Sequence, residues 1–279
     1  MGDTALVLGA GGITGVGWEI GMLYGLAEAG VDVTGADLVV GSSAGSVVAA
    51  QITSGRIGLP ALYERQLARP DGEVPAHLGP ATVFRFARAA LTSRTPEEYG
   101  RKLGRMALAA DTPGEAERRA VIAGRLVSHE WPRRRLRITA VAADSGELRI
   151  FERESGVELV DAVAASCAVP GVWPTVGVEG RRWIDGGVHS PANAQLAAGY
   201  DRVVVLAPLA IGGGPLDSPR TQVAKLITAG ARVELITPDA AARRSFGRNS
   251  LEPSRRAPAA RAGRAQAAAH AAAVAELWS

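Results

Sequence analysis

The sequence contains little cysteine and little histidine, and both shortages narrow the range of functions. Its one cysteine, Cys167, excludes a disulfide scaffold and any metal site built from cysteine, and it is typical of a reducing compartment. The four histidines, His77, His129, His189 and His270, are not spaced with acidic residues as metal ligands are. The sequence therefore predicts no metal site.

The sequence also lacks a basic N-terminal segment and a long apolar run. The first basic residue is Arg56, so the start of the chain lacks the positively charged region of a secretory signal peptide. The uncharged segment 38–55 is interrupted by glycines and serines, which makes it a poor transmembrane helix. We expect a soluble, cytoplasmic protein in which any membrane contact is peripheral.

Neither sign of charge dominates the composition. The chain has 31 basic and 28 acidic side chains, a net charge of +3, which gives no reason to expect a nucleic-acid partner. Residues 243–264 carry seven arginines and one glutamate, which indicates either a solvated helix face or a patch for phospholipid headgroups. With 47% apolar and 21% charged residues, the composition is that of a globular domain, here expected to span 1–279.

The beginning of the chain alternates strands with helices. The apolar run at 4–8 predicts a buried strand, followed by a glycine-rich turn and a helix over about 16–29. A second strand at 37–40 leads through another glycine-rich turn into a helix over about 44–53. This order is typical of a parallel α/β sheet.

Residues 56–134 interrupt this pattern with a segment of helical periodicity, and we interpret them as a helical insertion that forms a cap. The expected helices of the insertion are 61–68, 81–91, 97–109 and 115–126. The α/β pattern then returns with a helix at 158–166, and the expected strands are 136–141, 148–151, 182–184, 202–206 and 233–236. The alanine- and arginine-rich end, 250–279, predicts one C-terminal helix over about 257–278.

The motif Gly41-x-Ser43-x-Gly45 matches the nucleophile elbow of hydrolases. A serine on a sharp strand-to-helix turn is exposed and strained, and small residues on both sides let the strand and the helix pass closely. The expected strand precedes this motif and the expected helix follows it. Ser43 is therefore a candidate nucleophile, although a plain turn would have the same pentapeptide.

Two further glycine-rich loops are candidate parts of a site. The amides of Gly11, Gly12 and Ile13, ahead of Gly15, could converge on an oxyanion or equally on a phosphate. The run Asp185-Gly186-Gly187 holds a carboxylate at a strand end, although an isolated Asp-Gly pair is usually a hairpin turn. Neither loop is decisive alone.

The three loops together, in this order and each beside an expected strand, resemble the motifs of the patatin-like phospholipase family. These motifs are Gly11 to Gly15, Gly41 to Gly45 and Asp185 to Gly187. The segment 165–174 resembles the family's sequence ahead of its Asp-Gly turn. The likeness covers about 1–53 and 135–240, and hardly extends to the helical insertion.

The resemblance implies a three-layer α/β/α fold with a mainly parallel sheet, and a serine acyl hydrolase that acts on lipid or phospholipid esters. It assigns Ser43 as nucleophile and Asp185 as its base, in a dyad without histidine, and it implies no metal ion or other cofactor. It places the oxyanion hole at the amides of Gly11, Gly12 and Ile13. The remaining glycines of the three loops, Gly15, Gly41, Gly45, Gly186 and Gly187, support these positions.

The chain departs from the family pattern at two positions. Family members usually carry glycine where Ala10 stands, and arginine or lysine near Thr14. Without that cation, backbone dipoles alone face the acyl oxyanion. These departures bear on substrate preference and turnover.

Other functions remain open at this point. A nucleotide-binding protein could use Gly9-x-Gly11-x-x-x-Gly15, with Asp32 or Asp37 binding a ribose, and a non-catalytic lipid-binding relative would share all three motifs. An ordinary α/β-hydrolase is disfavoured because neither His189 nor His270 is well placed. In the insertion, we expect Phe84, Phe86 and Leu91 either to line an acyl channel or to pack a satellite core.

Overall fold

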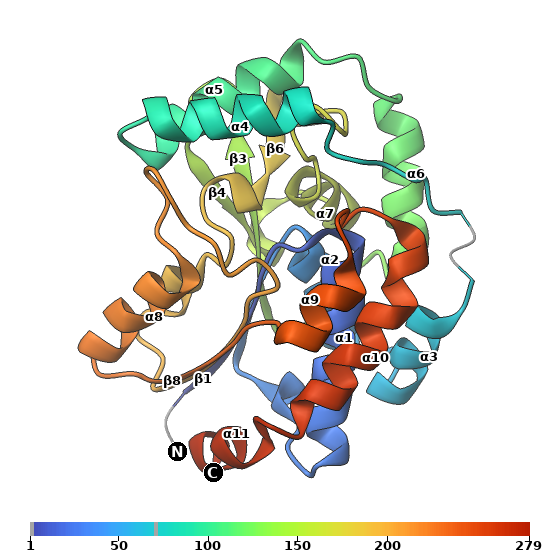
Figure 1. Cartoon of the computed structure of the whole chain (residues 1–279), viewed down its shortest axis with the longest axis vertical. Helices are drawn as coiled ribbons and strands as arrows, with labels where there is room; N and C mark the ends of the chain where they lie inside the picture. Colours follow the sequence, from blue (N-terminus) through green and yellow to red (C-terminus); the bar gives the residue numbers. More distant parts are fainter. Residues whose placement is uncertain (1–2, 70–71) are drawn as a thin grey trace.

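An eight-stranded sheet forms the centre of the molecule in the computed structural model, which describes residues 3–69 and 72–279 (Figure 1). Its strands are β1 (Thr4–Leu8), β2 (Leu38–Ser42), β3 (Arg135–Ala142), β4 (Leu148–Phe151), β5 (Val176–Val178), β6 (Arg181–Asp185), β7 (Arg202–Leu206) and β8 (Arg232–Ile236). They follow the order β5-β6-β3-β2-β1-β7-β8, with β4 also paired to β3. The neighbouring strands β3, β2, β1, β7 and β8 pair in parallel. The pairs of β3 with β4, of β3 with β6 and of β5 with β6 are antiparallel.

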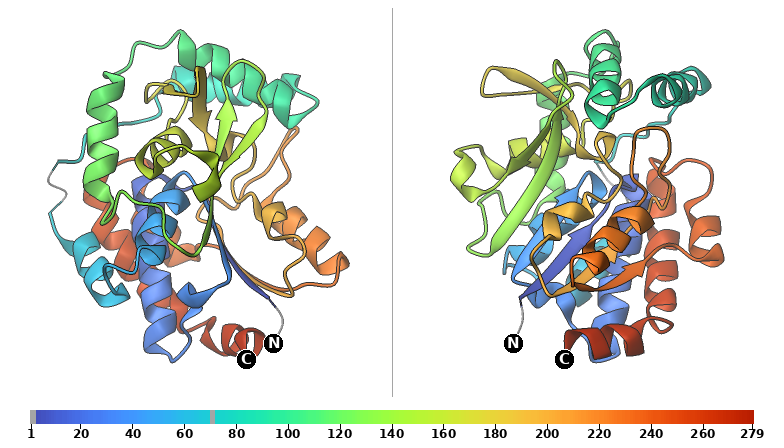
Figure 2. Two further views of the ribbon diagram at one scale, coloured as in Figure 1. Left: turned by 180° about the vertical axis from the view of Figure 1, so that it is seen from behind. Right: turned by 90° about the vertical axis from the view of Figure 1, so that its left-hand side faces the viewer.

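Helices cover both faces of this sheet (Figure 2). They are α1 (Gly12–Glu28), α2 (Ala44–Thr53), α3 (Leu59–Leu67), α4 (Pro80–Thr92), α5 (Pro96–Leu108), α6 (Glu115–Arg125), α7 (Leu159–Ser166), α8 (Pro219–Thr228), α9 (Ala240–Phe246), α10 (Arg256–Ala267) and α11 (Ala271–Trp278). The largest apolar core lies between one face and α1, α2, α7 and α10. A second core lies between the other face and α8. The expected three-layer α/β/α architecture with a mainly parallel sheet is confirmed.

The strands at the centre of the sheet are buried on both faces, and their sequences explain why. β1, β2 and β7 have no exposed residue, and the runs TALVL and RVVVL are almost continuously apolar. Such runs are typical of parallel strands between two helical layers. The carboxyl ends of these strands therefore stay free for loops that carry polar groups.

Close helix packing anchors α1, whose first turn belongs to the glycine loop. A Cβ atom on Gly21 of α1 would lie 2.0 Å from the carbonyl oxygen of Ala260 of α10. One on Gly263 of α10 would lie 2.2 Å from the carbonyl oxygen of Trp18. Glycine is therefore required at both positions, because any side chain would force the helices apart. The C-terminal part of the chain holds α1 in place through this contact.

The insertion is helical, as expected. Its described residues form α3, α4, α5 and α6 and contain no strand. The helices α4 and α5 lie side by side at the end of the molecule towards which β1 runs, while α6 descends along one side (Figure 1). None of the helices within 3–69 and 72–279 combines the length and the apolarity needed to cross a bilayer.

The C-terminal segment differs from expectation, because two helices replace the single one. Residues 268–270 separate α10 from α11, although alanine-rich sequence favours a continuous helix. Tertiary packing explains the break. The turn buries Val274 and Leu277 against the core, and it lets Arg202 donate to the carbonyl of Trp278. The elements β5, α8 and α9 were not predicted from the sequence either.

Candidate active site

Two strands share one edge of β3, and their ends meet there. β2 pairs with residues 135–139 of β3, and β6 pairs with 140–142. β4 pairs with 138–141, which overlaps both, so it occupies the opposite edge of β3. β2 and β6 therefore lie end to end along the same edge of β3, and they run in opposite directions. This arrangement brings the end of β6, at Asp185, to the end of β2, next to Ser43.

Ser43 lies on the turn between β2 and α2 in a strained conformation. Its φ of 53° and ψ of −117° are rarely adopted by a residue with a side chain. A Cβ atom on Gly45 would lie 2.1 Å from the carbonyl oxygen of Leu8, and one on Gly41 would lie 2.6 Å from that of Gly45. Both glycines are thus needed for the close approach of strand and helix that the motif predicts.

The structure brings Ser43 and Asp185 together. The Ser43 hydroxyl donates a 2.7 Å hydrogen bond from Oγ to Oδ2 of Asp185, and both residues are buried. The other carboxylate oxygen, Oδ1, accepts from the amide of Gly187 at 2.7 Å. A Cβ atom on Gly186 would lie 2.2 Å from Oγ1 of Thr139, so this turn also requires glycine to sit against β3.

Burial makes the carboxyl of Asp185 a weaker acid than usual. It raises the pKa of the carboxyl to about 7, because an ionised carboxylate is poorly solvated there. The hydrogen bonds from Ser43 and Gly187, and the positive charge of Arg118, oppose this rise. A carboxylate with a pKa near neutrality can accept a proton and return it.

The glycine loop supplies free amides next to this pair. The N–H groups of Gly11, Gly12 and Ile13 donate no hydrogen bond to any residue that the structure describes. Gly12 has a φ of 61°, and Gly12 and Ile13 line the same cavity as Ser43. The next amide, of Thr14, is occupied by the carbonyl of Ser250 at 3.1 Å. The carbonyl of Ser250 thus fixes the end of the loop, while the amides of Gly11, Gly12 and Ile13 stay available to an anion.

The two departures from the family's glycine loop have structural roles. Ala10 packs on the Asp-Gly-Gly turn, since a Cβ atom on Gly187 would lie 2.8 Å from that of Ala10. Thr14 is fully buried, and its hydroxyl lies 3.3 Å from the carbonyl oxygen of Gly11. Neither position places a cation at the site.

No histidine in the described parts of the chain takes part in this pair. Nδ1 of His189 lies 3.0 Å from Oδ1 of Asn193, and His270 pairs with Glu234. His129 contacts a carbonyl of α6, and His77 is exposed. Within residues 3–69 and 72–279, no group of His, Cys, Asp or Glu side chains is arranged to hold a metal ion.

The acidic residues considered for ribose binding lie away from the glycine loop. Asp37 precedes β2 and accepts two hydrogen bonds from Thr4, which begins β1. Asp32 caps a short turn by accepting from Thr34. Both lie near the amino ends of strands, whereas the glycine loop follows the carboxyl end of β1. The structure therefore contradicts a nucleotide site that combines these residues.

A small cavity of about 30 Å³ opens beside Ser43. The glycine loop, the segment after α7 and the insertion line it, the last through Glu73, Val74, Arg118 and Arg125. The expectation that Phe84, Phe86 and Leu91 line an acyl channel is wrong for this cavity. Phe84 and Leu91 point to solvent, and Phe86 packs on the satellite core around α5. The sequence did not predict a role for these arginines, because only the folded chain distinguishes them from its many others.

A side-chain network behind the pair was also missed. Asn193, at a left-handed φ of 54°, donates to Oγ of Ser42 and to the carbonyl of Gly186. Ser42 also bonds to Thr139, and the Ser43 amide donates to Ser166. These buried bonds join the elbow, β3 and the Asp-Gly-Gly turn, so the serine and the carboxylate are held at a fixed separation.

The site thus combines a buried serine–carboxylate pair at the strand ends of a three-layer α/β/α fold with free amides beside it. The model of the patatin-like phospholipase family matches residues 6–198, and the chain belongs to this family.

Two solved structures are similar to the chain. VipD from Legionella pneumophila is 13% identical to this chain, with a TM-score of 0.48. The match covers 98% of this chain and 67% of the VipD chain. The type III effector protein ExoU shares 15% identity over 98% of this chain and 53% of that chain, with a TM-score of 0.41. The chain thus spans about half to two thirds of the length of these proteins. A comparison with curated proteins gives no match.

Proposed function

We propose that the chain is a serine acyl hydrolase that cleaves lipid esters with a Ser43–Asp185 dyad. The observation that carries this proposal is the 2.7 Å hydrogen bond between Oγ of Ser43 and Oδ2 of Asp185. Family membership supports lipid hydrolysis in general, and the strained elbow and the free amides support the serine mechanism.

In the proposed reaction, Oγ of Ser43 attacks the ester carbonyl while Asp185 accepts the serine proton. The negative charge on the carbonyl oxygen is stabilised by the amides of Gly11, Gly12 and Ile13. Asp185 then gives its proton to the leaving alcohol, which leaves an acyl group on the serine. A water molecule, deprotonated by Asp185, releases the fatty acid and restores the enzyme.

The proposal is tested with a panel of lipid esters and the purified chain. We expect release of free fatty acid, together with labelling by a fluorophosphonate probe that mass spectrometry of the digested protein places at Ser43. A non-catalytic lipid-binding relative would bind the same lipids without either result. Binding without hydrolysis or labelling would therefore replace the enzyme proposal by that alternative.

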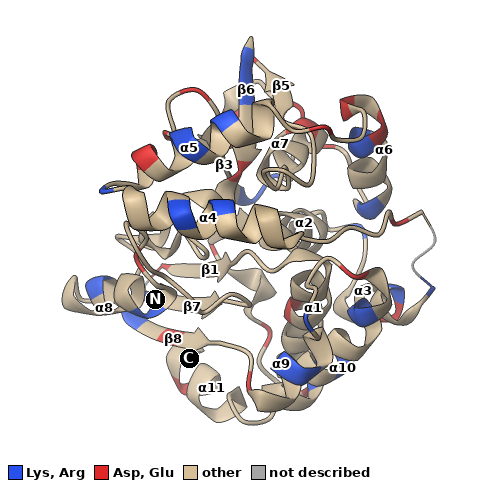
Figure 3. Cartoon of the chain, turned by 45° about the horizontal axis from the view of Figure 1, so that its top comes forward, with Lys and Arg blue, Asp and Glu red and all other residues tan. Residues whose placement is uncertain are grey.

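We further propose that α4 contacts the lipid surface. Val83, Phe84 and Leu91 are 52%, 68% and 85% exposed, and Ile211, in a loop that packs on α4, is 72% exposed. The helix also carries exposed arginines and no acidic residue (Figure 3). An apolar face with flanking arginines is suited to the interface of an anionic membrane.

The position of α4 connects this surface with the site. Thr82, in the first turn of α4, packs on Gly171. A Cβ atom added to Gly171 would lie 3.4 Å from Cγ2 of Thr82. Gly171 belongs to the segment after α7, in which Val169 and Trp173 line the cavity beside Ser43. A lipid surface that touches α4 therefore lies close to the wall of this cavity.

We expect the double change Phe84→Ser and Leu91→Ser to weaken binding to vesicles that contain phosphatidylglycerol by about tenfold or more, because apolar burial in the interface is lost. Vesicle sedimentation measures this effect. Ile227→Ser on α8, which removes an exposed side chain elsewhere, is the matched control. Equal binding by the double variant and the wild type would refute the role of α4.

A further inference from the structure

Arg118 reaches the Ser43 cavity from the insertion. It lies on α6, it lines the cavity together with Ser43 and Trp173, and it is only 5% exposed. Its charge is close enough to lower the pKa of Asp185. The buried guanidinium is therefore part of the surroundings of the serine–carboxylate pair, although it comes from outside the three loops.

The guanidinium of Arg118 lacks the partners that a buried charge normally has. Among the described residues, its Nε and Nη1 atoms have no hydrogen-bond acceptor. The guanidinium lies over the ring of Trp173, whose centroid is 3.8 Å from Cζ. Burial lowers the pKa of Arg118 to about 10, so the group remains charged at neutral pH. Leaving a buried cation unpaired is costly, which points to a ligand that pairs with it.

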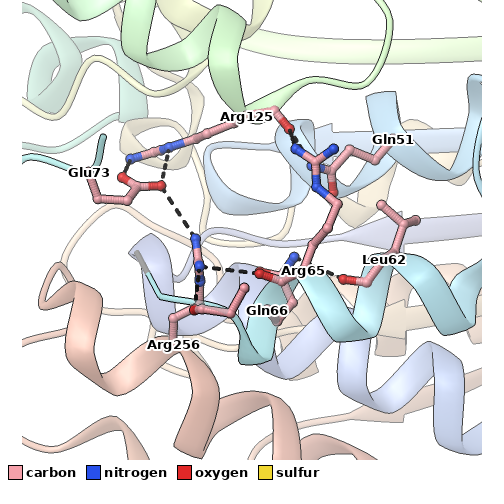
Figure 4. A network of polar contacts seen from close by, with 8 residues as sticks. Gln51, Leu62, Arg65, Gln66, Glu73, Arg125 and Arg256 are labelled. Carbon is pink, nitrogen blue, oxygen red and sulfur yellow. Dashed lines mark hydrogen bonds and ion pairs between the residues drawn. The ribbon is translucent and has the colours of Figure 1, made fainter. Parts of the chain in front are cut away.

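The neighbouring arginines do have partners, which makes Arg118 distinct. Arg125 donates from Nε and Nη2 to the two carboxylate oxygens of Glu73, at 3.0 and 2.6 Å, and Arg256 lies 3.7 Å from the same carboxylate (Figure 4). On the outer side of α6, Arg119 pairs with Glu158 and Asp161. Within residues 3–69 and 72–279, Glu73 thus pairs with two other arginines, and Arg118 is the basic residue of the cavity wall that has no ion pair.

We propose that Arg118 binds the phosphate of a phospholipid substrate whose ester lies at Ser43. The Nε and Nη donors of a guanidinium match two oxygens of a phosphate, and the ring of Trp173 holds the guanidinium plane. In a glycerophospholipid the phosphate is only a few bonds from the ester, which suits a cation in the same cavity. This inference rests on the proposed function and deepens it, because it favours phospholipids over neutral lipid esters.

A neighbouring cavity provides space for the polar headgroup of such a lipid, because its wall carries charged side chains such as Arg65, Arg69 and Glu117. It has a volume of about 520 Å³ and shares Ile13, Val16, Glu73 and Arg125 with the wall of the Ser43 cavity. The Glu73–Arg125 pair stands between the two cavities. A lipid whose phosphate is held by Arg118 can therefore extend past this pair.

The test compares a phosphatidylglycerol with the diacylglycerol of the same acyl chains, in neutral detergent micelles and at a pH well above the pKa of Asp185. For Arg118→Met we expect kcat/KM for the phospholipid to fall about 10- to 100-fold, mainly through KM, because a charged hydrogen-bond donor is lost. The value for the diacylglycerol should change less than about threefold. Arg118→Lys should fall in between, since lysine keeps the charge without the planar fork.

Arg119→Met is the matched control, because it removes the neighbouring arginine on the side of α6 that pairs with Glu158 and Asp161. We expect it to leave the ratio of the two substrates unchanged. Thermal unfolding identifies any variant that fails to fold. If Arg118→Met does not fold, the two substrates are compared with Arg118→Lys. Equal loss on both substrates in a folded Arg118 variant would overturn the proposal.

Binding separates this inference from the proposed function. Ether-linked analogues of the two lipids cannot be hydrolysed, and their binding is measured by titration of wild type and Arg118→Met. Tighter binding of the ether phospholipid that depends on Arg118 supports the inference even if no ester is cleaved. Displacement of that lipid by inorganic phosphate at similar concentration would show a general anion site and overturn it.

Discussion

Replacing Ser43 by alanine is expected to lower ester hydrolysis by about 10⁵- to 10⁶-fold, the loss that follows removal of a catalytic serine in other hydrolases. The hydroxyl is the group that would form the acyl-enzyme, and Asp185 alone cannot replace it. The protein should stay folded, because the elbow keeps its glycines and the Ser43 amide keeps its bond to Ser166. Labelling by a fluorophosphonate should disappear as well.

Ser42→Ala is the control for this experiment. The Ser42 hydroxyl bonds to Thr139 and accepts from Asn193, away from the attacking position. We expect it to keep most activity while lowering stability by about 1–3 kcal/mol, because buried partners lose a hydrogen bond. If labelling survives Ser43→Ala, the nucleophile lies elsewhere.

Replacing Asp185 by asparagine is expected to lower turnover by about 10⁴-fold, as when the acid that supports a catalytic base is made neutral. Asparagine keeps the shape of the side chain but cannot accept the proton of Ser43. In the wild type, kcat/KM should fall about tenfold per pH unit below the pKa of Asp185, near 7, because protonation removes the base. Above that pKa the activity should level off.

His189→Ala distinguishes a dyad from a triad. His189 contacts Asn193 rather than Asp185, so we expect this variant to keep most activity and the same acidic limb in its pH profile. If His189→Ala is as inactive as Asp185→Asn, a histidine carries the proton and the dyad is wrong. Near-full turnover by Asp185→Asn would refute the mechanism.

Much of the fold could be predicted because its signals are local. The apolar runs at 4–8 and 202–206 are too short and too continuous for surface elements, and the structure places both in the buried centre of the sheet. Three helices of the insertion, α3, α4 and α5, begin at or next to a proline, which the sequence shows directly. β5 was missed because three residues that pair only with β6 leave almost no pattern. The break at 268–270 follows from packing, which alanine-rich sequence does not reveal.

The loops of the candidate site could be predicted because each glycine is required by its own close contact. Gly45 against Leu8 is an example, and such positions remain visible in a single sequence. The distance between Ser43 and Asp185 could not be predicted, since it depends on two strands sharing one edge of β3. Arg118 was also out of reach, because nothing near it in the sequence distinguishes it from its paired neighbour Arg119.

The shared edge of β3 has a consequence for how such an enzyme can be altered. Ser43 and Asp185 are set by strand pairing, whereas Arg118 and the exposed face of α4 belong to 56–134, which leaves the sheet after α2 and rejoins it at β3. In the proposed function, the chemical step and the choice of lipid are therefore encoded in separate stretches of chain. Exchanging 56–134 for another helical segment of similar end-to-end distance would redirect selectivity while the reactive pair stays in register, which makes this region the natural target for engineering new substrates.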